Sequence, residues 1–229
     1  TYWAQTQTPG LGGDKGSHRG QFDYDGDRYG LRVERLVVGA DFNPEVGFLR
    51  RDDFERSFGA LRFSPRLHSV ASIRQLFWEG HLDYTTSRAG VLETREAQGR
   101  FGVLFENSDE LDVTYTRLYE FLDEPFPIAP DVTIGGGAYR FQDARVSFRR
   151  GTQRRLSGSV AVQRGSFFGG DKTSVEVTSA RLELSPRLSV EPGASFNWVD
   201  LPEGNFTTEL ATARTTYTMT PLMFVSALL

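Results

Sequence analysis

The sequence predicts an all-β fold, an antiparallel up-and-down meander of about 13 long strands. Three observations lead to this prediction. Aromatic residues (13%) and 24 glycines accompany a hydrophobic share of only 38%, a balance that favours strands over helices. Compact clusters of Pro, Gly, Asn, Asp and Ser recur along the chain, as expected of turns. Between these clusters, apolar and polar residues alternate with the period of two that a strand requires.

The strands are predicted between the turn clusters, and most exceed the length of about five or six residues that is usual in soluble sheets. Short turns are expected at 23–30, 63–67, 105–111, 149–155, 184–188 and 219–222. Long connections are expected at 8–17, 41–53, 80–90, 121–137, 166–172 and 200–205. Because the two kinds alternate, all short turns should lie at one end of the sheet, as in outer-membrane barrels. The predicted strands are 1–7, 18–24, 30–40, 54–63, 67–79, 91–105, 110–120, 138–149, 154–165, 173–184, 188–199, 206–219 and 222–229.

The stretch LSPRLSVEPGASFNWVD (184–200) shows the alternation clearly, with Phe196 and Trp198 on one parity and Glu191 and Asn197 on the other. A packed interior does not suit the polar parity, because buried charges must be paired throughout. The pattern therefore favours part of a transmembrane β-barrel, with the apolar parity against lipid and the polar parity lining a wet lumen. The side chains expected to face the lumen are Arg32, Glu34, Arg155, Gln163, Glu191 and Asn197.

Composition excludes several other classes. The net charge of −4 gives no general attraction to nucleic acid, so no nucleic-acid partner is expected. The chain has no cysteine and therefore no disulfide or thiolate metal site. No apolar run approaches the roughly 18 residues of a membrane helix.

The connection at 41–53 is the best candidate for a binding loop, because it concentrates charge at one rim of the sheet. The competing interpretation is that its arginines and carboxylates pair to hold the loop folded. Trp78, Trp198 and Phe48, expected near the same end, indicate an interfacial aromatic girdle or, alternatively, platforms for sugar stacking. The candidate binding residues are Asp41, Asn43, Glu45, Arg50, Arg51, Asp52 and Asp53.

Catalytic and metal signals are weak. Asp23, Asp25 and Asp27 hint at a calcium loop, but the twelve-residue ligand pattern is absent and a hairpin turn is the preferred interpretation. The three histidines lack metal spacing, so no metal ligand, cofactor or catalytic residue is predicted. A barrel hydrolase that uses His81 with Asp83 remains an alternative.

Four stretches resemble one bacterial family: GADFNPEVGFLRRDDF (39–54), FLDEPFPIAPDV (121–132), RGSFFGG (164–170) and the segment 201–229. The barrel of that family is catalogued as a domain of unknown function, and it commonly follows a module similar to family-9 carbohydrate-binding domains. The resemblance implies one β-barrel domain over 1–229, incomplete at both ends, in the bacterial outer membrane. It also implies contact with outer-membrane lipid and passage or capture of a glycan or another small solute. The alternative is a soluble or cell-surface all-β carbohydrate-binding protein.

Overall fold

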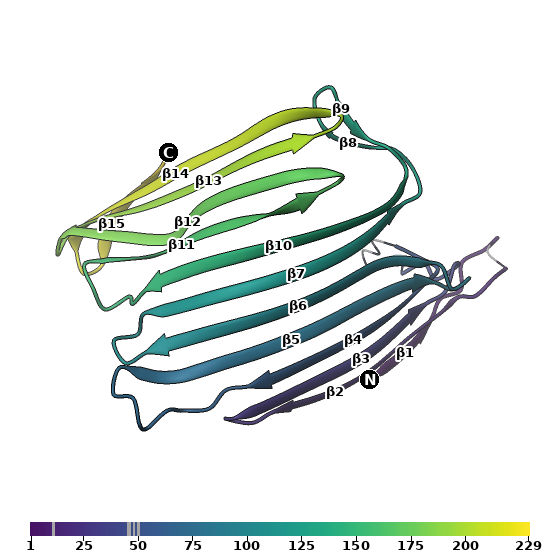
Figure 1. Cartoon of the computed structure of the whole chain (residues 1–229), viewed down its shortest axis with the longest axis horizontal. Coiled ribbons are helices and arrows are strands. Elements are labelled where there is room, and N and C mark those ends of the chain that lie inside the picture. Colours follow the sequence, from purple (N-terminus) through teal and green to yellow (C-terminus); the bar gives the residue numbers. More distant parts are fainter. Residues whose placement is uncertain (11, 45–46, 48, 50) are drawn as a thin grey trace.

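A computed structural model describes residues 1–10, 12–44, 47, 49 and 51–229. These residues form 15 strands and no helix, which confirms the all-β prediction. Figure 1 shows the strands running side by side across the molecule. The strands are β1 (Tyr2–Gln5), β2 (Gly16–Asp25), β3 (Tyr29–Val38), β4 (Phe54–Phe63), β5 (Ile73–Ser87), β6 (Leu92–Phe105), β7 (Glu110–Leu122), β8 (Phe126–Ala129), β9 (Val132–Ile134), β10 (Gly137–Arg150), β11 (Leu156–Phe167), β12 (Gly170–Ser185), β13 (Leu188–Leu201), β14 (Gly204–Thr220) and β15 (Met223–Leu228).

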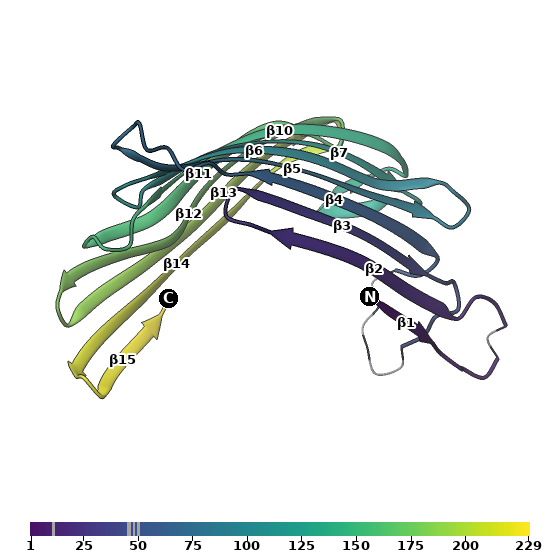
Figure 2. The same cartoon turned by 90° about the horizontal axis from the view of Figure 1, so that it is seen from below.

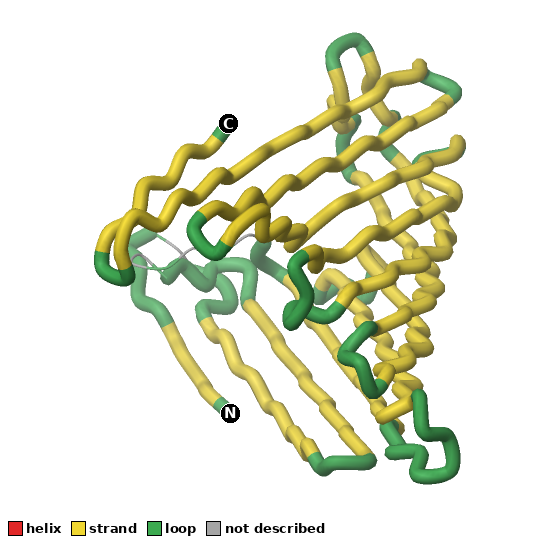
Figure 3. Tube along the Cα trace, turned by 90° about the vertical axis from the view of Figure 1, so that its left-hand side faces the viewer, coloured by secondary structure: helices red, strands yellow, loops and turns green. Residues whose placement is uncertain are grey.

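Thirteen of the strands form one antiparallel sheet in chain order, and β8 and β9 form a separate hairpin. The predicted meander is therefore confirmed. The sheet is curved like a trough (Figures 2 and 3), and its edges are β1 and β15, which do not pair with each other in the described part of the chain. The sheet of the described residues is thus open.

The polar side chains occupy the concave face of the trough. Side chains converge on a concave face and diverge on a convex one, so burial distinguishes the two. Glu34 and Ser174 are 7% and 2% exposed, whereas Leu61 and Val160, on the opposite parity, are 66% and 50% exposed. The face that carries charge is therefore the more enclosed one, and the apolar face is the open one.

The boundaries predicted for the fifth strand are wrong. The sequence predicted a strand at 67–79 and a long connection at 80–90, but β5 runs over Ile73–Ser87. The polar residues of GHLDYTTS suggested a loop. In a sheet with one polar face, however, polar residues fit a strand as long as they alternate with the residues of the other face. His81 and Asp83 lie on the concave face, and Leu82 lies on the convex face.

The prediction that short turns lie at one end of the sheet and long connections at the other is confirmed only in part. The connections 26–28, 106–109, 151–155, 186–187 and 221–222 are short and lie at one end, here called the β2–β3 end. The longer connection 64–72 also lies there, because β5 begins late. The opposite end, called the β3–β4 end, carries the long connections 6–15, 39–53 and 123–136 but also the short ones 88–91, 168–169 and 202–203.

The connection 121–137, predicted as a plain break, contains the β8–β9 hairpin. Its buried Val132 and Ile134 pack with Phe141, Phe168 and Leu201 in the main apolar cluster of the described residues. Phe141 shares the concave face with the polar residues, so the hairpin covers that face at the β3–β4 end.

Candidate functional site

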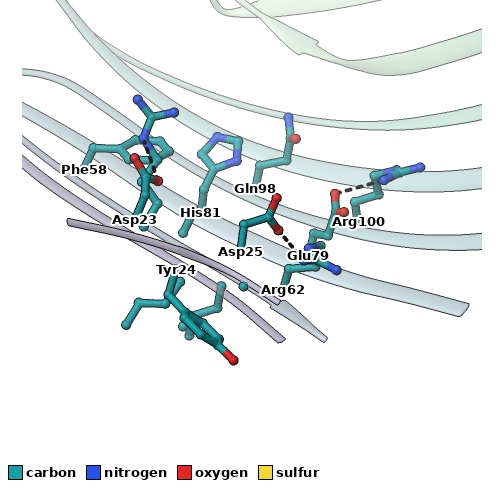
Figure 4. A pocket seen from close by; sticks show the side chains of 15 residues that line it. Asp23, Tyr24, Asp25, Phe58, Arg62, Glu79, His81, Gln98 and Arg100 are labelled. Carbon is teal, nitrogen blue, oxygen red and sulfur yellow. Dashed lines mark hydrogen bonds and ion pairs between the residues drawn. The ribbon is translucent and has the colours of Figure 1, made fainter. Parts of the chain in front are cut away.

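The concave face of β2 to β6 forms an open hollow of about 410 Å³. Figure 4 shows Asp23, His81, Gln98 and Arg100 projecting into it, while Tyr24 points to the other side of the sheet. The lining alternates acidic and basic groups from neighbouring strands. The site is therefore a charged surface with both signs represented.

Glu34 is the centre of the first ion-pair group. Its carboxylate contacts Arg19, Arg32 at 3.4 Å (Nη2–Oε2) and Arg56 at 3.3 Å (Nη1–Oε1), and its side chain is only 3% exposed. Arg56 also donates from Nε to Oδ1 of Asp83 at 2.8 Å. These contacts link β2, β3, β4 and β5 by charge across the concave face.

Arg100 on β6 is the centre of a second ion-pair group, in which a cation is surrounded by carboxylates. It donates to Glu79 (Nη1–Oε2, 2.9 Å), to Glu110 (Nη2–Oε1, 2.7 Å) and to Asp112 (Nε–Oδ1, 2.7 Å). Gly102 leaves room for this arrangement, because a Cβ at that position would lie 2.8 Å from Oδ1 of Asp112. One guanidinium thus holds three carboxylates from two strands, β5 and β7.

His81 does not form the arrangement that a hydrolase would need with Asp83. Its Nε2 lies 2.9 Å from Oε1 of Glu96, while Asp83 is bound by Arg56. Among the hydrogen bonds of the described residues, none joins the His81 ring to a serine or threonine hydroxyl. The geometry therefore offers no activated nucleophile at this position.

The six residues predicted to face a lumen fall into two groups. Arg32, Glu34, Gln163, Glu191 and Asn197 lie on the concave face. Gln163 donates to Asp143 at 2.8 Å (Nε2–Oδ1), and Asn197 accepts from Ser174 at 2.7 Å (Oγ–Oδ1).

Arg155 differs from the prediction. It lies in the turn 151–155 before β11 rather than in a strand, and its carbonyl accepts from the Glu183 amide at 2.7 Å. The predicted strand 154–165 began two residues too early, because the turn continues through Arg155 and β11 starts at Leu156.

The candidate binding residues of the 39–53 connection hold neighbouring loops together. The Asp41 carboxylate accepts from the Gly13 amide, and the Asn43 amide donates to Oγ1 of Thr6 at 3.1 Å. Arg51 pairs with Glu93 at 2.6 Å (Nη1–Oε2).

Of the other predicted residues of this loop, the structure describes Asp52 and Asp53, and none of the hydrogen bonds or ion pairs of the described residues joins these two. The Asp53 carbonyl accepts from the Arg88 amide at 3.0 Å, and Asp52 is exposed. Glu45, Arg50 and the aromatic Phe48 lie outside the described residues. The contacts that are present favour the interpretation that charge holds this loop folded.

Asp23, Asp25 and Asp27 frame the 26–28 hairpin turn instead of a calcium loop. Asp25 pairs with Arg62 at 2.5 Å (Oδ1–Nη2) and Asp27 with Arg66 at 2.8 Å (Oδ1–Nη2). The hydrogen bond and charge of Arg66 hold the pKa of the Asp27 carboxyl below its usual range. No group of three or more metal-ligating side chains occurs in the part of the chain that the structure describes.

The convex face carries a row of aromatic rings at the β2–β3 end. Tyr29, Phe63, Trp78 and Phe101 contact in sequence, with ring centroids 5.3, 5.6 and 5.4 Å apart. Trp78 was expected at the opposite end, and the error follows from the misplaced fifth strand. Trp198 does lie near the β3–β4 end, stacked with Phe196 at 6.1 Å.

The sequence did not reveal the two ion-pair centres as such. Glu34 was singled out only by its parity, and Arg100 was not singled out at all. The spacing Glu79, Arg100, Asp112 becomes a signal only when the register of β5, β6 and β7 is known.

No protein-family model, curated protein sequence or solved structure matches the chain. Within the residues that the structure describes, no helix is long and apolar enough to cross a membrane. Inferences about function therefore depend on the two faces of the sheet.

Proposed function

We propose that the chain forms part of the wall of an outer-membrane β-barrel, with its convex face in lipid and its concave face toward water. We further propose that this wall serves the passage or capture of a small polar solute. One observation carries the proposal. The sheet is a single layer whose convex face is apolar and exposed, and no second layer of the described residues covers it. A contiguous apolar surface of this extent in water would promote association.

The apolar band has dimensions that suit a membrane. On β5 it extends from Leu76 through Trp78, Gly80 and Leu82 to Tyr84, eight residue steps that span about 26 Å along the strand. A strand tilt of about 40° shortens this to about 20 Å, near the roughly 25 Å apolar band of outer-membrane barrels. The aromatic row from Tyr29 to Phe101 bounds the band at the β2–β3 end, where an interfacial girdle would lie.

The concave face supports a wet lumen rather than a dry core. Its ion pairs are partly exposed, as at Arg100 (26%) and Glu79 (33%). Complete burial of so many charges would cost more in desolvation than their pairing returns. Charges of both signs in such a channel interact with small polar or charged solutes.

Aromatic stacking on a sugar is poorly supported on the concave face. Phe58 lies there, but Arg32 and Arg56 stand over its ring at 5.5 and 5.4 Å. Trp78 and Trp198 belong to the convex parity. A glycan in this lumen would therefore be held mainly by hydrogen bonds to charged side chains.

The membrane assignment is tested by tryptophan fluorescence. Trp3, Trp78 and Trp198 all lie on the convex parity. The full chain folded with liposomes of brominated phosphatidylcholine should lose most of its tryptophan emission relative to non-brominated lipid. Trp78→Phe and Trp198→Phe identify the contribution of each ring. A protein that folds cooperatively in water and shows no quenching would refute the proposal.

The passage of solute is tested by conductance and by swelling of proteoliposomes. Arg100→Gln and Glu79→Gln remove opposite charges from the same concave cluster, so they should shift cation-to-anion selectivity in opposite directions. Glu203→Gln, in the exposed 202–203 turn, is the control and should leave selectivity unchanged. Equal selectivity in all three variants would contradict a role of this face in passage and leave capture as the function to test, by equilibrium binding of labelled solutes.

A further inference from the structure

Three arginines stand on the apolar convex face, at its β3–β4 end. Arg95 lies on β6, Arg117 on β7 and Arg140 on β10, three strands that are adjacent in the sheet (Figure 1). All three side chains are exposed. A cluster of charge is unexpected here, because residues on the same face toward the middle of these strands are apolar, as at Ala97, Val113 and Val146.

The register places the backbone positions of the three arginines around one tyrosine. Arg95 and Arg140 lie directly opposite Tyr119 from its two sides, and Arg117 is two residues before Tyr119 on the same strand and face. Diagonal neighbours in such a ladder lie about 7–8 Å apart between Cα atoms, within reach of long side chains. The guanidinium of Arg140 lies over the Tyr119 ring at 5.8 Å.

The positive charges of these three arginines have no acidic partner among the described residues. None of the three forms an ion pair with a carboxylate of the described residues, whereas Arg35, on the same face, pairs with Glu55. The Arg117 side chain points toward Tyr115: its guanidinium lies over the Tyr115 ring at 5.7 Å, and its Nε donates to the Tyr115 hydroxyl at 3.2 Å. Like charges set close together on a sheet are destabilising unless an anion lies between them.

A shared hollow gives an anion room to bind. Arg95, Arg117 and Arg140 line it together with Tyr84, Gln142 and Leu82. Tyrosine and amide groups supply hydrogen-bond donors beside the guanidiniums, and Leu82 continues into the apolar band. The hollow therefore joins a polar, cationic part to an apolar one, the arrangement of a lipid headgroup above its acyl chains.

We propose that this cluster binds a phosphate group in the headgroup of a membrane lipid, whose acyl chains lie along the apolar band. The inference rests on the proposed membrane position of the convex face. Phosphate suits the site because guanidinium groups pair with its oxygens in a forked geometry. A phosphate monoester, as in phosphatidic acid, also carries more negative charge than a carboxylate. The cluster would hold such a lipid at one membrane boundary and fix the depth of the sheet.

The test compares three matched proteins in proteoliposomes. The cluster variant carries Arg95→Gln, Arg117→Gln and Arg140→Gln. The control carries Arg28→Gln, Arg150→Gln and Arg187→Gln, which remove the same charge from exposed arginines at the β2–β3 end. Native mass spectrometry after release into neutral detergent counts bound phosphatidic acid, with phosphatidylcholine and inorganic phosphate as separate arms.

Wild type and control should retain phosphatidic acid in preference to phosphatidylcholine, and the cluster variant should bind it at least about tenfold more weakly. Arg117→Lys, which keeps the charge and loses the fork, should give an intermediate affinity and covers the case in which the triple variant fails to fold. Equal binding by the cluster variant and the control overturns the inference, as does binding of inorganic phosphate as tight as that of the lipid. Tryptophan quenching in the same samples separates this failure from failure of the membrane proposal: quenched wild type without lipid preference refutes only the cluster, and unquenched wild type refutes both.

Discussion

At the scale of single residues, the concave face depends on a few groups with several partners. Glu34 is nearly buried and touches three guanidiniums, so its loss leaves Arg19, Arg32 and Arg56 with too little negative charge. Breaking a buried pair from one side is costly because the remaining charge stays desolvated. Partial exposure of the arginines reduces this cost.

Glu34→Gln should lower the free energy of unfolding by about 1–3 kcal/mol. The glutamine keeps the shape and loses the charge that holds the three guanidiniums together. Denaturant midpoints of wild type, Glu34→Gln and the exposed Glu203→Gln measure the effect. An equal midpoint for Glu34→Gln and Glu203→Gln would show that the cluster contributes little.

Asp109 predicts a pH dependence at the β2–β3 end. Its carboxylate accepts from the Gly151 amide at 2.9 Å (Oδ1) and pairs with Arg154 at 3.2 Å (Oδ2), so it joins the turns 106–109 and 151–155. The hydrogen bond from Gly151 in particular holds the pKa of Asp109 below its usual value. A lowered carboxyl pKa adds stability above the unfolded value of about 3.9, and that stability disappears as pH falls through the lower folded value.

Asp109→Asn should therefore be less stable than wild type at neutral pH, and the difference should shrink as pH falls below about 4. Unfolding midpoints of both proteins from pH 7 to pH 2 measure it. A difference that stays constant over this range would mean that the charge of Asp109 contributes nothing.

At the scale of elements, the turn 168–169 and the β8–β9 hairpin support each other. Phe168 and Gly169 both have positive φ, 42° and 85°, as a tight hairpin turn requires. Phenylalanine is unfavourable in this conformation, yet its ring is held against Phe141 at 4.7 Å and Tyr139 at 5.1 Å. Packing of the same cluster also fixes Ile134 of β9.

Ile134→Ala should release the β8–β9 hairpin locally. Ile134 is fully buried, and removing its side chain costs about 2–5 kcal/mol of packing. An isolated two-stranded hairpin is marginal in water, so this cost exceeds what holds it in place. Limited proteolysis should cut within 123–136 faster than in wild type and in the exposed Thr133→Ala. Equal cleavage of the two variants would contradict the role of Ile134.

At the scale of the whole molecule, the sheet separates two environments with one layer. Val162 and Gln163 are neighbours on β11, but Val162 lies on the convex face and is 47% exposed, and Gln163 lies on the concave face. In water, a charge at so exposed a site as Val162 would change stability by only about 0.5 kcal/mol. In a bilayer, a charge should be far more costly to stability at Val162 than at Gln163.

Val162→Arg should cost about 2–4 kcal/mol in a bilayer, while Gln163→Arg should fold normally, since Asp143 lies beside it. Folding yield in liposomes, measured by the shift of the folded band on electrophoresis without heating, compares the two. If both variants fold equally well in liposomes, the convex face does not contact lipid.

The order and type of the strands were readable from the sequence because alternation and turn residues act locally. The error at β5 shows the limit of such local signals. Gly80, His81 and Asp83 are residue types common in loops, and only pairing with β4 and β6 keeps them in a strand. The β8–β9 hairpin was not predicted for a related reason, since its short apolar stretches gain stability from contacts with Phe168 and Leu201, far along the chain.

By itself, the sequence determined an antiparallel meander with one apolar and one polar parity, because a period of two assigns neighbouring side chains to opposite faces. Only the tertiary structure decided which face is concave, which charges meet in the groups around Glu34 and Arg100, and that Arg95, Arg117 and Arg140 gather at the β3–β4 end of the sheet. These outcomes depend on the register between strands and on the curvature of the sheet. Both arise from contacts between residues distant in the chain, and no local pattern encodes them.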